Sequence, residues 1–364
     1  MASDRSLRIP APALLAATTR VFVALGLPGP AAAAVADGLV EADMRGIPSH
    51  GLMLVPMYAE RIQAGSVTTA TEAETVADLG AIAVLDAANA LGILTGDQAM
   101  ALAVERARKF GIGAVAVRHA FHFGGAFRYV MAASGAGLVG IAAANTRPLI
   151  PAPGGAEAVI GNNPLAIGVP RAGADPIVLD MALSEAALGK IRLAAAEGRE
   201  IPPTWATDAA GIPTTDPEAA IAGLLLPAAG PKGYGLAFIV DALTGVLSGG
   251  SFGAGVKGLY ADTAVANDCA HFFLAIDPAA FGGAESFAAR VDELAAQVSA
   301  SRTAPGVERV FLPGQPEAER HAAALAEGVR VERGVIDKLR EVAAPLGVDL
   351  DRDLGSTDPE EDDR

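Results

Sequence analysis

The sequence predicts an α/β fold of the α+β type, and three observations lead to this prediction. Apolar residues recur at helical spacing near both ends of the chain, at 10–63 and again at 318–345. Between these regions, short apolar runs typical of buried strands alternate with turns rich in glycine and proline. With 364 residues, of which 51% are apolar and 19% charged, the chain can form a sizeable hydrophobic core.

The N-terminal region is expected to be helical, with helices at 10–25, 30–43 and 52–63. In the first of these, Arg20 lies opposite the apolar face, and Gly26 and Pro28 end the pattern. The same stretch resembles an export signal because arginines precede an apolar run, but Arg20 interrupts that run. We therefore expect no export signal and a cytoplasmic location.

The middle of the chain begins with a strand–helix–strand unit. Strands are expected at 81–86 and 111–118, and the helix between them at 95–110, with Thr95 as its cap and Gln98 three residues later. The remaining predicted elements are, in order, helix 125–134, strands 138–145, 166–170 and 176–182, helix 184–197, a polar proline-rich connection at 199–217, helix 233–247, strand 271–276, helix 284–300 and the helical region 318–345.

One glycine motif invites a functional interpretation. Residues 135–140, GAGLVG, match the G-x-G-x-x-G pattern of dinucleotide-binding loops. Such a loop follows a strand and opens a helix, because the pyrophosphate binds the free N–H groups of the helix N-terminus. Here the predicted order is reversed, with a helix before the motif and a strand after it. We therefore interpret these glycines as a helix C-cap and a turn.

Charge and cysteine content exclude several classes of protein. The formal net charge of -15 and the sequence pI near 4.8 argue against a nucleic-acid partner, because phosphates would be repelled. The sequence offers no run of about 18 apolar residues free of glycine, proline and charge, so no membrane span is expected. The only cysteine, Cys269, permits neither an internal disulfide nor a zinc site built on thiolates.

Two histidines in predicted turns are candidates for proton transfer. His50 lies in RGIPSHG and His122 in HAFHFGG, and an imidazole with a pKa near 6.5 suits acid/base chemistry at neutral pH. The alternative is that each is an ordinary turn histidine. His119 and His122 would share a face in a helical turn, but no carboxylate stands at ligand spacing, so no metal site is expected.

Two charged residues stand where an anion or a cofactor could bind. Lys232, in PKGYG, is placed at a predicted helix N-terminus, where a cation and free amides favour a phosphate. Simple solvent exposure is the alternative. Asp180 ends an apolar strand and leads into a helix, where its charge is expected to stabilise the helix N-terminus.

Six blocks of sequence carry a resemblance to a known family. They are RGIPSHG (45–51), HFGG (122–125), PAPGGAEAVIGNNPLAIGVP (151–170), VLDMALSEAALGKI (178–191), PPTWATDAAGIPTTDP (202–217) and PKGYGLAFIVDALTGVLSGG (231–250). Together and in this order they resemble the type-2 malate/L-lactate dehydrogenase family, which includes ureidoglycolate and sulfolactate dehydrogenases and reductases of cyclic imino acids.

The resemblance implies NAD(P)-dependent hydride transfer at the carbon next to a carboxylate, carried out by a homodimer. It also implies a fold unrelated to the Rossmann domain, in which a largely antiparallel sheet binds the cofactor and segments from both termini form a helical domain. On this basis we expect a helical domain at 1–75 and 300–350, a small α/β segment of the catalytic region at 76–125, a cofactor-binding domain at 126–299 and a disordered acidic tail at 351–364.

The resemblance also implies roles for individual residues. His50 would be the acid/base that gives a proton to the carbonyl oxygen or imine nitrogen as hydride arrives, and Ser49 would orient it or the substrate. His122 competes with His50 for the same role. The cofactor-binding residues that the resemblance implies are Thr146, Asp180, Met181, Ala182, Lys232, Gly233, Pro313, Gly314 and Gln315.

This sequence departs from the family pattern at two places. Leu54 stands where the family commonly has an arginine that binds the substrate carboxylate, and leucine cannot replace a guanidinium there. Around His122, the family's Asn-Ser and Gly-Tyr pairs are replaced by His119, Ala120, Phe127 and Arg128. Either Arg128 or Arg147 supplies the missing positive charge, or the substrate is larger, more apolar or carries its acid elsewhere.

Three functions therefore stay open. The first is a dehydrogenase of 2-hydroxy or 2-oxo acids, and the second is a reductase of a cyclic imine carboxylate such as a pyrroline or piperideine carboxylate. The third is a member that binds a nucleotide or ligand without turnover, against which the retained SHG, DMA and KGYG blocks argue. The choice between NAD and NADP depends on contacts to the ribose 2′ position, which the sequence does not locate.

Overall fold

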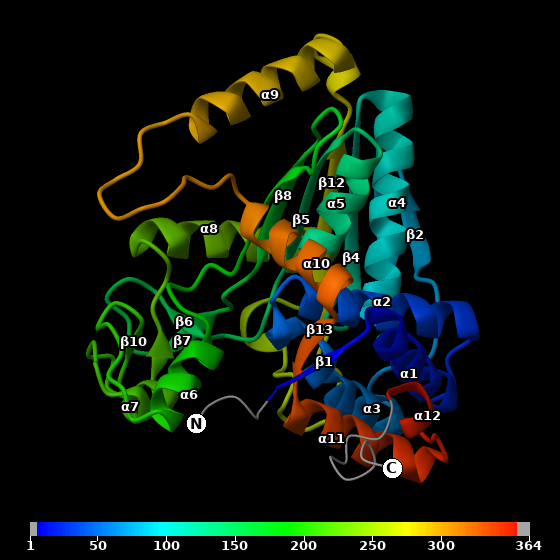
Figure 1. Ribbon diagram of the computed structural model, residues 1–364, viewed down its shortest axis with the longest axis vertical. Helices are drawn as coiled ribbons and strands as arrows, with labels where there is room; N and C mark the ends of the chain where they lie inside the picture. The colour runs from blue at the N-terminus through cyan, green and yellow to red at the C-terminus, as the bar shows by residue number, and fades with distance from the viewer. Residues whose placement is uncertain (1–5, 355–364) are drawn as a thin grey trace.

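The computed structural model describes residues 6–354, and its centre is a seven-stranded sheet (Figure 1). The strand order is β2 (Glu74–Asp78), β3 (Ile82–Asp86), β4 (Ile112–Ala120), β12 (Cys269–Ile276), β5 (Val139–Ala144), β8 (Leu165–Val169) and β9 (Ile177–Met181). Only β3 and β4 pair in parallel, and all other neighbours are antiparallel. The expectation of a mixed α/β fold with a largely antiparallel sheet is confirmed.

The topology of this sheet brings the segments that follow β4 and β5 to the same end of the strands. Strand β12 lies between β4 and β5 and runs antiparallel to both, so its first residues face the last residues of each neighbour. Cys269 pairs with Ala120, and His271 pairs with Ala144. The segments that follow β4 and β5 therefore leave the sheet side by side. The sheet also contains strands from both 76–125 and 126–299, so the expected boundary at 125/126 does not separate two sheets.

Helices α4 (Gly92–Phe110) and α5 (Phe127–Gly135) cover one face of the sheet (Figure 1). Small residues such as Ala103 and Ala133 let their backbones approach it closely. The predicted cap at Thr95 is wrong: α4 begins three residues earlier, and Thr95 lies buried inside it with a hydroxyl that has no hydrogen-bond partner among residues 6–354. Gln98 instead bonds the backbone of Ala73.

The turn between α5 and β5 agrees with the interpretation of the GAGLVG motif. Helix α5 ends at Gly135, the N–H of Leu138 donates back to Ala133, and β5 starts at Val139. Gly137 has a φ of 78°, which a residue with a side chain rarely adopts. These glycines therefore end a helix and turn the chain, as expected.

The N- and C-terminal segments share one hydrophobic cluster. It contains α1 (Ala11–Ala24), α2 (Gly29–Met44), α3 (Val55–Ala64), α10 (Gln315–Glu327) and α11 (Arg333–Ala343). The predicted helical region 318–345 is interrupted, because Gly328 ends α10 and a strand follows it, β13 (Val329–Glu332). This strand buries two valines and pairs with β1 (Ser6–Ile9) from the other end of the chain.

Besides the cluster of the two chain ends and the core between the sheet and helices α4 and α5, a third hydrophobic cluster is formed by the segment between β5 and β12. Its elements are the short strands β6 (Ile150–Pro151), β7 (Ala158–Ile160), β10 (Ala206–Thr207) and β11 (Leu224–Leu225) and the helices α6 (Leu188–Ala196), α7 (Pro217–Ile221) and α8 (Pro231–Asp241). The helix predicted at 184–197 thus begins only at Leu188. The one predicted at 233–247 continues after Asp241 as a π-helical turn, Ala242–Val246.

Two further helices complete the described chain. Helix α9 (Ala284–Ser299) stands beyond one end of the sheet, and a long connection leads from it back to α10 (Figure 1). The start of the predicted disordered tail is ordered as a short helix, α12 (Asp351–Leu354), in which Asp353 pairs with Arg20. The rest of that tail lies outside the described residues. Within them, no helix is both long and apolar enough to cross a membrane.

Candidate active site

The structure brings the two candidate histidines together. His50 lies on a single 3-10 turn (Pro48–His50) after α2, and His122 lies in the loop that follows β4. Their rings stack with centroids 5.4 Å apart and an interplanar angle of 27°. Residues separated by 72 positions in the sequence therefore form one pair, at the end of the sheet where β4 ends.

Each histidine has a hydroxyl against one ring nitrogen. The Tyr58 hydroxyl is 2.8 Å from Nδ1 of His122, and the Ser49 hydroxyl is 3.0 Å from Nδ1 of His50. Tyr58 is fully buried in α3, so it holds the His122 ring in a fixed orientation. Because both Nδ1 atoms are engaged, Nε2 of each ring is the nitrogen available to a substrate.

Burial keeps both imidazoles neutral near pH 7. It lowers the pKa of His50 below the ordinary value of 6.5. The pKa of His122 is lowered well below that value, first by burial and then by the charges of His50 and His271. A neutral imidazole can accept a proton, so the pair is suited to act as a base toward a hydroxyl.

A half-buried carboxylate supports the loop that carries His50. The Asp43 carboxylate in α2 accepts the N–H of Leu52 at 2.7 Å and packs against the backbone of Gly51, where a side chain would collide with it. Burial raises the pKa of Asp43 to about 7, and the bond from Leu52 lowers it by a smaller amount. The chain is thus fixed at the C-terminal end of the SHG motif, directly after His50.

His271 and Cys269 lie beneath the pair at the start of β12. His271 is fully buried and stacks on Phe123 with centroids 4.6 Å apart, and Cys269 Sγ is 3.5 Å from its Nε2. Burial lowers the pKa of His271 to about 3 and raises the pKa of the Cys269 thiol. Both groups are therefore neutral, which suits a packing role better than a nucleophilic one.

His119 does not share a helical face with His122. It lies in β4 with a φ of 48°, and its Nδ1 is 2.9 Å from the carboxylate of Asp86 on the neighbouring strand β3. Among residues 6–354, no group of three or more histidine, cysteine, aspartate or glutamate side chains is placed to hold a metal ion.

Most of the predicted cofactor-binding residues lie around the edge strand β9. Asp180 in β9 accepts the N–H of Phe127 at 2.8 Å, at the start of α5. The carbonyl of Pro313 accepts the N–H of Val178, so Pro313, Gly314 and Gln315 run along the outer edge of β9. Met181 ends β9, and Ala182 leads from it to Leu183, whose N–H donates to the carbonyl of Asn162. The Asn162 side chain is in turn 3.0 Å from the Thr146 hydroxyl.

Lys232 and Gly233 open helix α8 close to the same segment. Ala228, in the turn that leads into α8, donates its N–H to the carbonyl of Leu183, and Gly233 is buried against the Ala228 carbonyl. Lys232 is exposed and makes no ion pair within residues 6–354. Its ammonium group is therefore available for an anion near the N-terminus of α8.

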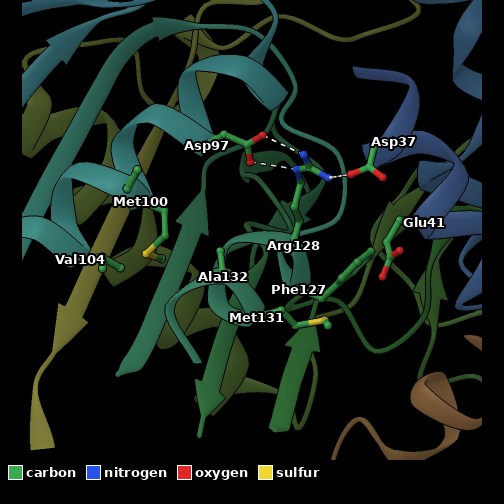
Figure 2. A pocket seen from close by; sticks show the side chains of 10 residues that line it. Asp37, Glu41, Asp97, Met100, Val104, Phe127, Arg128, Met131 and Ala132 are labelled. Atoms are coloured by element: carbon green, nitrogen blue, oxygen red, sulfur yellow. Dashed lines mark hydrogen bonds and ion pairs between the residues drawn. The ribbon is translucent and has the colours of Figure 1, made fainter. Parts of the chain in front are cut away.

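Arg128 is already occupied by two carboxylates, as Figure 2 shows. It lies in α5, donates two bonds of 2.8 Å to Asp97 of α4, and donates one of 2.6 Å to Asp37 of α2. These residues line a cavity of about 610 Å³ together with Met100 and other apolar side chains. The hypothesis that Arg128 is a free carboxylate clamp is corrected by this pairing. Arg147, by contrast, is exposed just after β5.

Sequence reasoning missed two residues that shape this site. Tyr58 and Asp43 contact the histidine loops through side chains, but they lie on regular helices where a tyrosine or an aspartate is unremarkable. Their closeness to the SHG motif in the sequence could have indicated them. Asp43 precedes the motif, and Tyr58 follows it, by less than the length of two helical turns.

Comparison with known proteins places these features in a family context. A family model described as malate/L-lactate dehydrogenase matches residues 9–340. A malate dehydrogenase of Pyrococcus abyssi is 37% identical over 353 residues, which is 95% of this chain and 96% of that protein. The NAD(+) ureidoglycolate dehydrogenase of Escherichia coli K12 is 38% identical over 306 residues, 84% of this chain and 87% of the relative.

Solved structures agree with these sequence matches. The sulfolactate dehydrogenase of Methanocaldococcus jannaschii is similar with a TM-score of 0.90 at 34% identity, covering 95% of this chain and 99% of that one. The Δ1-piperideine-2-carboxylate reductase of Pseudomonas syringae is similar with a TM-score of 0.83 at 30% identity, covering 93% and 100%.

Proposed function

The chain belongs to the malate/L-lactate dehydrogenase family, and on this premise we propose that His50 and His122 carry the proton transfer of its reaction. It is an NAD(P)-dependent oxidoreductase that moves a hydride between nicotinamide and C2 of a 2-hydroxy or 2-oxo acid. The observation that carries the assignment of the two histidines is their stacked arrangement, with the Tyr58 hydroxyl holding one ring.

His50 is the proton carrier in this proposal. Its ring is only partly buried, and its Nδ1 contacts the exposed hydroxyl of Ser49, so it can exchange a proton with water. His122 resists protonation more strongly, because its pKa lies further below 6.5. His50 would thus take the hydroxyl proton during oxidation and return it to the oxo oxygen during reduction, while His122 orients that oxygen.

The residues around β9 fit a dinucleotide. Lys232 and the free N–H groups at the start of α8 suit a phosphate, and the Thr146 hydroxyl suits a neighbouring polar group of the cofactor. When bound, the nicotinamide supplies or accepts the hydride. We further propose that binding uses this edge of a mostly antiparallel sheet and no Rossmann unit, which is supported by the position of GAGLVG in a turn after α5.

A substitution of His50 tests the proposal. His50→Gln is expected to lower kcat by about 10²-fold or more in both directions, because a positioned acid/base contributes 10²–10⁴-fold. NADH binding, followed by its fluorescence, should change by less than about twofold. His321→Gln is the matched control, since His321 contacts Glu41 on the helical side of the molecule. Full activity in His50→Gln with loss in His122→Gln would reverse the two roles.

A cyclic imine carboxylate is the second candidate substrate. The structural similarity to the piperideine-carboxylate reductase supports it, since the hydride chemistry is the same and only the proton acceptor changes from oxygen to nitrogen. Rates with NADH and NADPH against 2-oxo acids and cyclic imines distinguish the two classes. Binding of NADH without reduction of either class would indicate a member that has lost turnover.

We also propose that the protein is a cytoplasmic homodimer. A reducing compartment is consistent with the single, buried and unpaired Cys269. A dimer is supported by the outer face of α8 and the following π-helical turn, where Phe238, Ile239 and Leu247 are each more than half exposed. Contiguous apolar surface of this kind marks association sites.

A further inference from the structure

Arg128 joins two hydrophobic cores of the molecule. Helix α2 packs in the cluster that the two chain ends form, and α5 packs in the core between the sheet and its helices. From α5, the Arg128 guanidinium donates one bond of 2.6 Å to Asp37 of α2 and two of 2.8 Å to Asp97 of α4 (Figure 2). One side chain therefore connects α2 to both helices that cover the sheet.

Each side of this connection carries one histidine of the candidate pair. His50 lies in the turn that follows α2, and His122 lies in the loop that precedes α5. The two rings stack with centroids 5.4 Å apart. Their spacing therefore depends on where α2 lies relative to α5.

The path from Asp37 to the His50 turn is short and stiff. Asp37 and Asp43 lie in the same helix, six residues or about 9 Å apart along its axis. Asp43 accepts the N–H of Leu52 and packs against Gly51, directly after His50. A shift of α2 at Asp37 therefore moves the His50 turn with it.

The loop of His122 is attached to α5 in a similar way. The Tyr129 hydroxyl of α5 donates a hydrogen bond to the carbonyl of Phe123, which directly follows His122. The N–H of Phe127, at the start of α5, donates to Asp180 of β9 at 2.8 Å. The loop and the first turn of α5 are thus held together and to the sheet.

Apolar packing holds α2 only weakly at the level of Arg128. The three helices α2, α4 and α5 leave between them the cavity of about 610 Å³ that their side chains line. Beside it, α2 presents Gly38, which has no side chain, to Ile93 of α4. Such a contact is non-directional, whereas the hydrogen bonds of a guanidinium to carboxylates fix both distance and orientation.

The two residues that depart from the family pattern at the start of α5 both contact α2. Arg128 bonds Asp37, and the ring of Phe127 lies under the guanidinium of Arg45, 5.2 Å away. Arg45 in turn donates to Glu41 of the same helix at 2.8 Å. The departure thus replaces a pair of residues by one that attaches α5 to α2.

We propose that Arg128 is a positioning residue that holds α2 in place relative to α5 through Asp37 and thereby sets the spacing of the two histidines. This inference rests on the proposed function, since it takes the histidines as the groups that move the proton. Catalysis depends steeply on the placement of the reacting groups, and a displacement of about 1 Å can lower a rate 10²-fold.

Asp37→Ala tests the proposal, because it breaks the bond between α2 and α5 and leaves Arg128 paired with Asp97. We expect kcat to fall about tenfold while the KM for NADH stays within about twofold. The Asp37 side chain is 56% exposed, and an exposed ion pair contributes little stability, so the midpoint of thermal unfolding should fall by less than about 3 °C. An unchanged kcat would overturn the proposal.

Substitutions of Arg128 test whether the loss arises at this bond. Arg128→Gln removes all three hydrogen bonds and should lower kcat at least as much as Asp37→Ala. In the Arg128→Gln background, Asp37→Ala should add less than about twofold to the loss, because the bond is already absent. A further tenfold loss would contradict the shared route. Arg128→Lys keeps the charge without the planar fork and should retain more activity than Arg128→Gln.

Asp78→Ala is the matched control. Asp78 pairs with Arg106 of α4 at 2.7 Å, and the exposed fractions of these side chains, 43% and 17%, are close to the 56% and 18% of Asp37 and Arg128. Arg106 lies near the end of α4, whereas the His122 loop contacts the start of that helix. The kcat of Asp78→Ala should stay within about twofold of the wild type, since no candidate-site element is attached there. Equal losses in Asp37→Ala and Asp78→Ala would overturn the proposal.

A spectroscopic measurement separates this inference from the proposed function. The ring Cε1–H signals of the five histidines are recorded by NMR on protein with carbon-13 in these rings, and each signal is assigned from a substitution by glutamine. In Asp37→Ala the signals of His50 and His122 should shift, because stacked rings change each other's resonances. The signal of His119, which Asp86 holds on the neighbouring strand, should stay in place.

The outcomes of this measurement do not depend on turnover. Unshifted signals of His50 and His122 in Asp37→Ala would refute the positioning role, whether or not any acid is reduced. Shifted signals in an enzyme that reduces neither 2-oxo acids nor cyclic imines would refute the proposed function alone.

Discussion

Asp43 holds the loop that follows His50, and its ionisation is expected to change the stability of the protein. Its carboxylate is held in α2 between Gly51 and the N–H of Leu52, and burial raises its pKa from 3.8 to about 7. In the unfolded chain the same group ionises near pH 3.8. The folded state therefore binds one more proton than the unfolded state between these two values, and the protein loses stability as pH rises through this range.

Asp43→Asn is expected to remove this pH dependence. Asparagine keeps an oxygen that accepts the Leu52 N–H, so the variant and the wild type should unfold at similar free energies near pH 4. Near pH 8 the variant should be more stable by up to about 4 kcal/mol, because it lacks the carboxylate whose ionisation the fold disfavours by about three pKa units. Denaturant unfolding at both pH values measures this. The prediction would be contradicted if the free energy of unfolding of the variant, minus that of the wild type, were no larger at pH 8 than at pH 4.

Single residues also show where sequence-based prediction stops. His50 and His122 were identified from short motifs, and the structure brings them into one pair. Arg128 could not be judged in this way, because Asp37 and Asp97 lie 91 and 31 positions away in the sequence. Its two partners are set by helix packing, which no local pattern encodes.

At the scale of elements, periodicity predicted the long helices and central strands, while short strands and exact helix starts escaped it. Strands β1 and β13 are four residues each and are stabilised by pairing between the two ends of the chain. Such pairing depends on contacts of high sequence separation, which a local window does not contain. Helix α4 begins earlier than its sequence pattern predicts for a related reason, because its first turn packs against the loop of His122.

Gly92, the first residue of α4, makes this contact between helix and site. A Cβ at Gly92 would collide with the backbone carbonyls of Phe121 and His122. Gly92→Ala is therefore expected to displace the His122 loop, destabilise the protein by about 1–3 kcal/mol and lower kcat. Thermal unfolding and steady-state rates measure both effects. Gly29→Ala is the control, because nothing lies within 4 Å of a Cβ there, and an unchanged Gly92→Ala enzyme would show that the loop does not depend on this contact.

For the whole molecule, the distribution of charge bears on assembly. The chain carries a net charge of -15, yet after the exposed Lys232 at its start, α8 and the π-helical turn expose large apolar side chains and no charged one. The one acidic residue in that stretch after Lys232, Asp241, is buried and bonded to Asn145 and to the backbone of Gly253. Two copies that meet through this face avoid bringing their negative charges together.

The proposed dimer should therefore depend on this face. Light scattering of the wild type is expected to give twice the chain mass of 36.6 kDa, and Ile239→Glu should give the single-chain mass, because two glutamates would face each other across a twofold interface. Leu79→Glu is the matched control, since Leu79 is 80% exposed in the turn between β2 and β3. Circular dichroism verifies that both variants are folded. A single-chain mass for the wild type would refute the dimer. A folded Ile239→Glu variant that still has twice the chain mass would show that the dimer interface does not include this face.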